Sequence, residues 1–194
     1  MRNPFSPHRR GARLIASEVR IIGVGSPFGD DSIAWSAIDF LDRQAFSVKF
    51  PSHSIELSKS DRPGIGLLEL MRDCRLVVLI DAMQAGSRPG TIRSLSAEEV
   101  RDGAVAVSSH DFGIKSALAI GEAMGDIGAT VEVIGIEVGA QNTDPLIRRD
   151  WDRFMEGDEP ATEGARSRPE PDTAALVRLL TDVLRHHGIT SGNK

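Results

Sequence analysis

Short apolar runs alternate with segments of helical periodicity along most of the chain. Runs rich in apolar and β-branched residues predict strands, at residues 19–25, 46–50, 76–80, 90–95, 105–109 and 130–138. The run at 76–80 is apolar at every position, which is typical of a central strand covered on both faces. Strands that alternate with helices predict an α/β fold in which helices cover both faces of one sheet.

Apolar residues that recur every three or four positions predict helices, at residues 31–41, 65–71, 97–101, 112–124, 146–155 and 173–187. We expect Asp111 to cap the helix at 112–124. The last helix ends in Arg185, His186 and His187 before Gly188, and cations followed by a glycine are typical of a helix C-terminus. We therefore interpret the two histidines as part of the cap rather than as metal ligands.

The composition divides the chain into a core and flanking segments. Residues 1–17 contain four arginines and no long apolar run, so we expect a flexible basic tail. Residues 18–155 form the predicted α/β core. Prolines and acids dominate residues 156–172, which predicts a solvated acidic linker. The helix at 173–187 is expected to pack on the core, and residues 188–194 form a short tail.

Charge and cysteine content narrow the function classes. The 194 residues carry a formal net charge of −5, which argues against a nucleic-acid binder. No apolar run is long enough to span a membrane. Cys74 is the only cysteine, which excludes an internal disulfide and a thiolate metal cluster. A lone thiol fits the reducing cytoplasm, and we expect the protein to be a monomer. We interpret Cys74 as closing a helix-to-strand connection. A reactive thiol is the alternative, because the nearby Arg72 and Arg75 could lower the pKa of Cys74.

Three polar residues follow predicted strands. Asp31 comes after the first strand and its glycine-rich turn, Asp81 after residues 76–80, and His110 after residues 105–109. In an open α/β sheet the carboxyl ends of the strands line the ligand crevice. Two carboxylates and an imidazole that meet there could coordinate a divalent transition metal and leave positions open for water or substrate.

Each of these residues also has a purely structural explanation. Asp31 could stabilise the first turn of a helix, with Asp30 as its N-cap. Asp81 could accept backbone N–H bonds at a strand end, and His110 could be a hydrogen-bonded residue at a helix start. The sequence alone leaves the metal site and these structural roles open.

Other chemistries are less well supported by the sequence. The glycine turn resembles the start of a dinucleotide fingerprint, but Phe28 stands where the third glycine is needed. Asp30 and Asp31 are adjacent and point in different directions, which argues against an aspartic-protease dyad. A Ser26–His110–Asp81 hydrolase lacks the Gly-x-Ser-x-Gly elbow.

Three segments together resemble the [NiFe]-hydrogenase maturation proteases. They are Gly-Val-Gly-Ser-Pro-Phe-Gly-Asp-Asp at 23–31, Leu-Ile-Asp-Ala at 79–82 and Ser-His-Asp at 109–111. The resemblance spans about residues 19–140 and implies a mixed, mostly parallel sheet between helical layers, of the phosphorylase/hydrolase-like kind. It also implies a cytoplasmic endopeptidase that removes a C-terminal peptide from the hydrogenase large-subunit precursor after nickel insertion.

The resemblance assigns metal contacts to Asp31, Asp81 and His110, with nickel carried by the substrate. A non-cleaving, metal-sensing chaperone of the same fold is an alternative, and a nucleotide-binding α/β protein is a second one. The family's Gly-x-Gly after the acids is replaced here by Ser-Ile-Ala at 32–34, with Trp35 behind it, and its glycine-rich pair by residues 62–66. These departures indicate a divergent member, in which Trp35 fills the cleft or contacts substrate.

Overall fold

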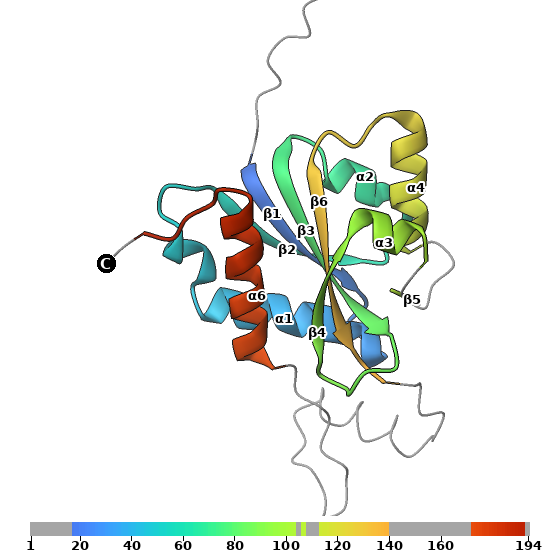
Figure 1. Ribbon diagram of the computed structural model, residues 1–194, viewed down its shortest axis with the longest axis horizontal. Coiled ribbons are helices and arrows are strands. Elements are labelled where there is room, and N and C mark those ends of the chain that lie inside the picture. The colour runs from blue at the N-terminus through green and yellow to red at the C-terminus, as the bar shows by residue number, and fades with distance from the viewer. Residues whose placement is uncertain (1–16, 104–105, 108–112, 140–171, 193–194) are drawn as a thin grey trace, which may run out of the picture.

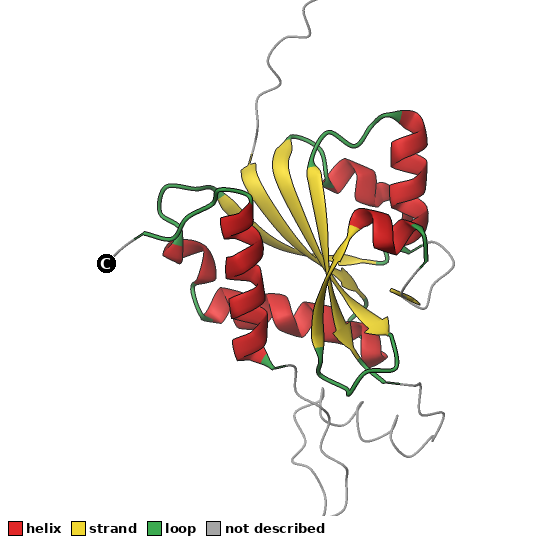
Figure 2. Cartoon of the chain, in the orientation of Figure 1, coloured by secondary structure: helices red, strands yellow, loops and turns green. Residues whose placement is uncertain are grey.

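A computed structural model describes residues 17–103, 106–107, 113–139 and 172–192 (Figure 1). One mixed sheet lies between two layers of helices, as Figure 2 shows. The strands are β1 (Ser17–Gly25), β2 (Ile55–Asp61), β3 (Cys74–Gln84), β4 (Ile92–Ser96), β5 (Ala106–Val107) and β6 (Thr130–Glu137). The helices are α1 (Ser32–Arg43), α2 (Leu67–Leu70), α3 (Ala97–Arg101), α4 (Ile114–Met124) and α6 (Thr173–His186), with short 3₁₀ turns η1 (Gly29–Asp31), η2 (Phe46–Lys49) and η3 (Gly64–Gly66).

The sheet is mostly parallel, as the sequence predicts. Its strand order is β2-β1-β3-β6-β4, and β5 pairs with the end of β3. The pairs β1–β2, β1–β3 and β3–β6 are parallel, whereas β4–β6 and β3–β5 are antiparallel. The carboxyl ends of β1, β2, β3 and β6 therefore share one edge of the sheet, where a ligand crevice is expected.

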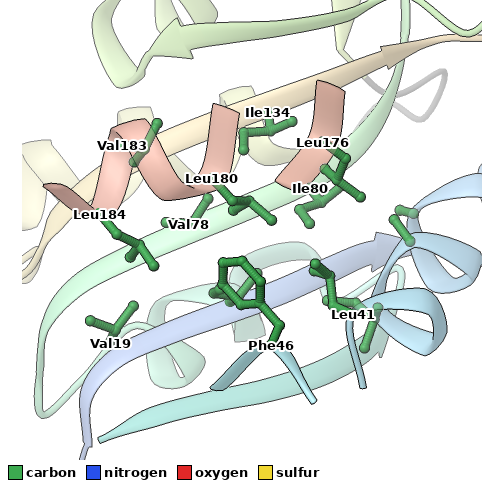
Figure 3. Close-up of a cluster of buried hydrophobic side chains, with 14 of the residues drawn as sticks. Val19, Leu41, Phe46, Val78, Ile80, Ile134, Leu176, Leu180, Val183 and Leu184 are labelled. Carbon is green, nitrogen blue, oxygen red and sulfur yellow. The ribbon is translucent and has the colours of Figure 1, made fainter. Parts of the chain in front are cut away.

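Each face of the sheet has its own apolar core. On one face α1 and α6 cover β1, β3 and β6, and Figure 3 shows leucines of α6 lying over Val78 and Ile80 of β3. Leu176, Leu180 and Leu184 are fully buried in this layer. On the other face α2, α3 and α4 pack against the alternate side chains of the same strands. The prediction that helices cover both faces is confirmed.

The prediction of a strand at residues 46–50 is wrong. Residues Phe46–Lys49 form η2, and the chain returns to the sheet only at β2. Phe46 and Phe50 are both buried, and their ring centroids lie 5.3 Å apart. Residues four positions apart share one face of a helical turn. In a strand, Val48 would also lie on the face of Phe46 and Phe50. Val48 is instead 72% exposed.

The other element boundaries differ by a few residues. Helix α4 begins at Ile114 with Gly113 in the N-cap position, so the start predicted at residue 112 is wrong. Asp111 and the predicted helix at 146–155 lie outside the described residues. Helix α6 ends at His186, with His187 as its C-cap and Gly188 at a φ of +76°. The glycine cap is confirmed, and His187 is hydrogen bonded to Glu132.

Candidate functional site

A compact turn carries the chain from β1 to α1. Gly29 has a φ of +65°, and Ser32 Oγ donates to the carbonyl of Gly29 at 2.7 Å. Ser26 is buried, and its Oγ accepts a bond from Phe28 N. A Cβ added to Gly25 would lie 2.2 Å from the carbonyl oxygen of Asp31. Gly25 is therefore required because the turn folds back on it.

This close approach argues against a phosphate site at the glycine turn. A phosphate cradle needs free backbone N–H groups that face open space at a helix N-terminus. Here the backbone of Asp31 fills the space beside Gly25, and two acids occupy the positions before α1. The nucleotide-binding alternative therefore has little support in the geometry of this turn.

Asp31 lies at the junction of η1 and α1. It occupies the N-cap position of α1, although its side chain makes no capping hydrogen bond. Asp30, which the sequence favours as the N-cap, instead lies inside η1 and is exposed. The prediction for Asp30 is wrong because the 3₁₀ turn starts before the α-helix and shifts the cap by one residue. The side chain of Asp31 is partly exposed at the edge of the sheet.

Asp81 is the most unusual carboxylate among the described residues. It lies within β3, which runs on to Gln84, rather than just after the strand as the sequence predicts. The residue is 1% exposed, and its Oδ1 accepts a bond from Ala82 N at 2.7 Å. Its Oδ2 is buried without a hydrogen-bond partner in the described part of the chain. An unsatisfied buried carboxylate oxygen is costly, which points to a ligand.

Burial raises the pKa of Asp81 well above its ordinary value, and the nearby charge of Asp31 raises it further. The pairing of β1 with β3 explains this proximity. It ends at Gly23 and Ile80, so Asp81 is the first residue of β3 beyond it. Asp81 thus adjoins the turn that carries Asp31, and the structure brings these two predicted site residues together.

His110 lies outside the described residues. Strand β5, the last described segment before it, pairs with Met83 and Gln84 at the end of β3. No group of three metal-binding side chains occurs among the residues with described positions. The roles of Asp31, Asp81 and His110 as one metal-contacting set therefore stay a prediction.

Glu137 is a buried acid that the sequence analysis missed. It ends β6 and is fully buried. Its Oε2 accepts bonds from Ala85 N at 2.9 Å and Ser87 N at 3.2 Å, and its Oε1 accepts one from Gly139 N at 3.1 Å. These bonds fix the start of the loop that follows β3, the strand that carries Asp81. The sequence signal for this role is an acid directly after the uncharged, buried run at residues 133–136.

Trp35 packs between α1 and β2 and is partly buried. Its Nε1 donates to the carbonyl of Ser60 at 3.4 Å, and Lys59 Nζ lies 5.6 Å from its ring centroid. Lys59 also pairs with Asp39 at 2.6 Å. The indole therefore helps to seal α1 against β2, and of the two roles expected for it the packing role has geometric support.

Cys74 is buried at the first position of β3, just after α2, as its interpretation as a connecting residue predicts. Its Sγ donates to the carbonyl of Met71 at 3.2 Å. Burial raises the pKa of the thiol, which outweighs the opposing charge of Arg20. A thiol in this environment is a poor nucleophile.

We expect the native protein to react with a thiol reagent more than roughly tenfold slower than the unfolded chain, because the thiol is buried and protonated. The rate of colour release from a disulfide reagent, with and without denaturant, measures this directly. Cys74 is the sole cysteine, so the signal has one source. Equal rates in the two states would show that the thiol is accessible in the fold.

Among the described residues, no helix combines the length and the apolar character needed to cross a bilayer.

Residues 63–147 match the model of a family described as HycI, hydrogenase maturation protease. This region includes Asp81 and His110 but not Asp31. The hydrogenase expression/formation protein HupD of Thiocapsa roseopersicina is 27% identical over 123 residues. That alignment covers 62% of the chain and 54% of HupD, so the chain spans about half the length of this curated relative.

Two solved structures share the fold over nearly their whole length. The hydrogenase-maturating endopeptidase HybD of Escherichia coli superposes with a TM-score of 0.55 at 17% identity, covering 88% of this chain and 94% of HybD. An Escherichia coli endopeptidase solved in solution gives a TM-score of 0.59 at 18% identity, over 90% and 96% of the two chains. These structures confirm the predicted fold class, and the family model and HupD support the resemblance to the hydrogenase maturation proteases.

Proposed function

We propose that this chain, a relative of the hydrogenase maturation proteases, is an endopeptidase that removes the C-terminal extension of a [NiFe]-hydrogenase large-subunit precursor after nickel insertion. The partner is the precursor, and the site of action is the cytoplasm. In this proposal nickel arrives in the cysteine site of the substrate, and it is a part of what the enzyme recognises.

The observation that carries this proposal is the buried Oδ2 of Asp81, which has no hydrogen-bond partner among the described residues and lies in the field of Asp31. The neighbouring carboxylates of Asp31 and Asp81 repel each other, and a divalent cation between them would relieve that repulsion. Carboxylate and imidazole are ligands that nickel accepts, so Asp81, Asp31 and His110 suit the ion chemically. A structural role alone would leave the Oδ2 of Asp81 without compensation for its burial.

Each residue then has a distinct task. Asp81 supplies a rigid carboxylate from the sheet, because both its strand and the next loop are fixed by hydrogen bonds. Asp31 supplies a partly exposed carboxylate from the turn, where substrate can approach. His110 completes the set of contacts. With these three side chains holding the substrate's nickel, the ion would supply Lewis-acid chemistry at the scissile bond or at its attacking water.

The rim of the site has features that suit a peptide. Phe28 is 73% exposed in the turn after β1, and Ile65 is 55% exposed in η3, which follows the adjacent strand β2. Large apolar side chains exposed beside a polar site are typical of contact surfaces. The two turns are joined by a bond from Arg62 N to the carbonyl of Gly25 at 2.9 Å. An extended C-terminal segment can therefore meet apolar contacts on the way to Asp31.

The proposal is tested with a nickel-loaded large-subunit precursor and the purified protein. Mass spectrometry should show the precursor losing a C-terminal peptide, and a nickel-free precursor should stay intact. Loss of the peptide from both precursors would refute the role of nickel. No loss from either, with the precursor nevertheless bound, would favour the non-cleaving chaperone.

A further inference from the structure

Arg62 occupies a strained position beside the turn that carries Asp31. It follows the last residue of β2, and its φ of +40° lies in the left-handed region that favours glycine. Its backbone N donates to the carbonyl of Gly25 at 2.9 Å. The same Gly25 packs directly against the carbonyl of Asp31. The backbones of Arg62 and Asp31 therefore meet at one glycine.

The guanidinium of Arg62 places a positive charge near the candidate site. Its Nε donates to Asp61 Oδ1 at 2.9 Å, and about half of the side chain is exposed. The hydrogen bond and charge of Asp61 raise the pKa of Arg62, and the charge of Asp31 contributes to the same shift. Arginine stays cationic in proteins, and Asp31 is among the charges near enough to contribute to the shift at Arg62.

A fixed cation beside a metal-contacting carboxylate weakens the attraction of that carboxylate for a free divalent ion. An ion that arrives in a cysteine site is different, because the thiolates that hold it already balance its charge. The repulsion from Arg62 is thus larger for free nickel than for nickel presented by the substrate. A positive charge at this position therefore disfavours free nickel more than nickel that is bound in the cysteine site of the substrate.

We propose that Arg62 makes the site selective for metal presented by the precursor, by disfavouring the capture of free divalent cations at Asp31 and Asp81. The inference rests on the proposed function and names a specificity-determining residue for it. Arg62 touches Asp61 and Gly25, and it acts on the metal through its charge alone. Its removal also leaves Asp61 unpaired, which adds to the attraction for a free cation.

Calorimetric titration of the protein alone with nickel chloride tests this inference. Arg62→Gln should bind free nickel roughly three- to tenfold more tightly than the wild type, because one screened unit charge is lost beside the ion. Arg185→Gln is the matched control, since Arg185 is also exposed and paired with an acid, Asp182, but lies near the end of α6. It should bind nickel like the wild type.

Equal affinities in the wild type and Arg62→Gln, or the absence of nickel binding in both, would overturn the inference. An equal gain in Arg185→Gln would overturn it as well, because the effect would then be one of net charge. Arg62→Gly provides a second variant if the glutamine variant folds poorly, since a φ of +40° suits glycine. The titration needs no precursor, so its result is independent of whether the protein cleaves.

Discussion

Asp81→Asn is expected to abolish precursor processing and, at the same time, to raise the Tm of the metal-free protein at neutral pH. The substitution keeps the shape of the side chain but removes a charge from a site that is 1% exposed. Processing is lost because an amide is a much weaker ligand for a divalent cation than a carboxylate. Stability rises because the buried carboxylate Oδ2 lacks a described partner.

The sign of the pH dependence follows from the raised pKa of Asp81. Below the ordinary aspartate pKa of 3.8 the carboxyl is protonated in both the folded and the unfolded chain. Folding then buries a neutral group, and the free energy of unfolding is not reduced by the burial of a charge. As the pH rises through the raised pKa of Asp81 in the folded state, the free energy of unfolding of the wild type falls. The Tm advantage of Asp81→Asn should therefore grow with pH, which thermal unfolding at a series of pH values measures.

Asp182→Asn is the matched control, because it removes an exposed carboxylate from α6. Its free energy of unfolding should stay within about 0.5 kcal/mol of the wild type. A Tm for Asp81→Asn below that of the wild type throughout the series would show that the ionised carboxylate is satisfied. Processing at the normal rate would remove Asp81 from the site.

Gly25→Ala is expected to reduce processing by roughly 100-fold or more, because a displacement of about 1 Å at a reacting group has an effect of that order. The added Cβ would lie 2.2 Å from the carbonyl oxygen of Asp31. Backbone atoms cannot rotate away, so the turn must shift and move Asp31 away from Asp81. The same clash should lower the free energy of unfolding by roughly 1–3 kcal/mol.

The rate of precursor cleavage and the Tm together test this second expectation. Gly128→Ala is the control, since a Cβ there meets no atom within 4 Å. That variant should cleave normally and have an unchanged or slightly higher Tm. A Gly25→Ala protein that cleaves at the wild-type rate would show that the position of Asp31 is not critical.

The sequence predicts the parallel core well because the middle stretches of β1, β3 and β6 are buried on both faces, as the wholly apolar run at residues 76–80 shows. Strand β2 was missed because it lies at the edge of the sheet, where only Ile55 and Leu57 of its residues pack against the core. Residues 46–50 look like a strand because their two phenylalanines carry β propensity. Tertiary packing of Phe46 and Phe50 overrides that preference.

The candidate site is predicted in part. Strand ends locate Asp31 and Asp81 at one edge of the sheet because parallel strands share their direction. The sequence cannot show that Asp81 is buried with one oxygen lacking a partner in the described segments, since this depends on how far β3 extends past β1. It also cannot show the role of Glu137, whose donors come from residues that lie far apart in the sequence.

The three bonds to Glu137 have a consequence for how this site can vary. All three donors are backbone N–H groups, at Ala85, Ser87 and Gly139. Every residue except proline supplies such a donor. The side chains of the loop after β3 can therefore change from one relative to another while its path is kept by one buried acid. The surface of this loop can diverge in this way without disturbing the strand that holds Asp81.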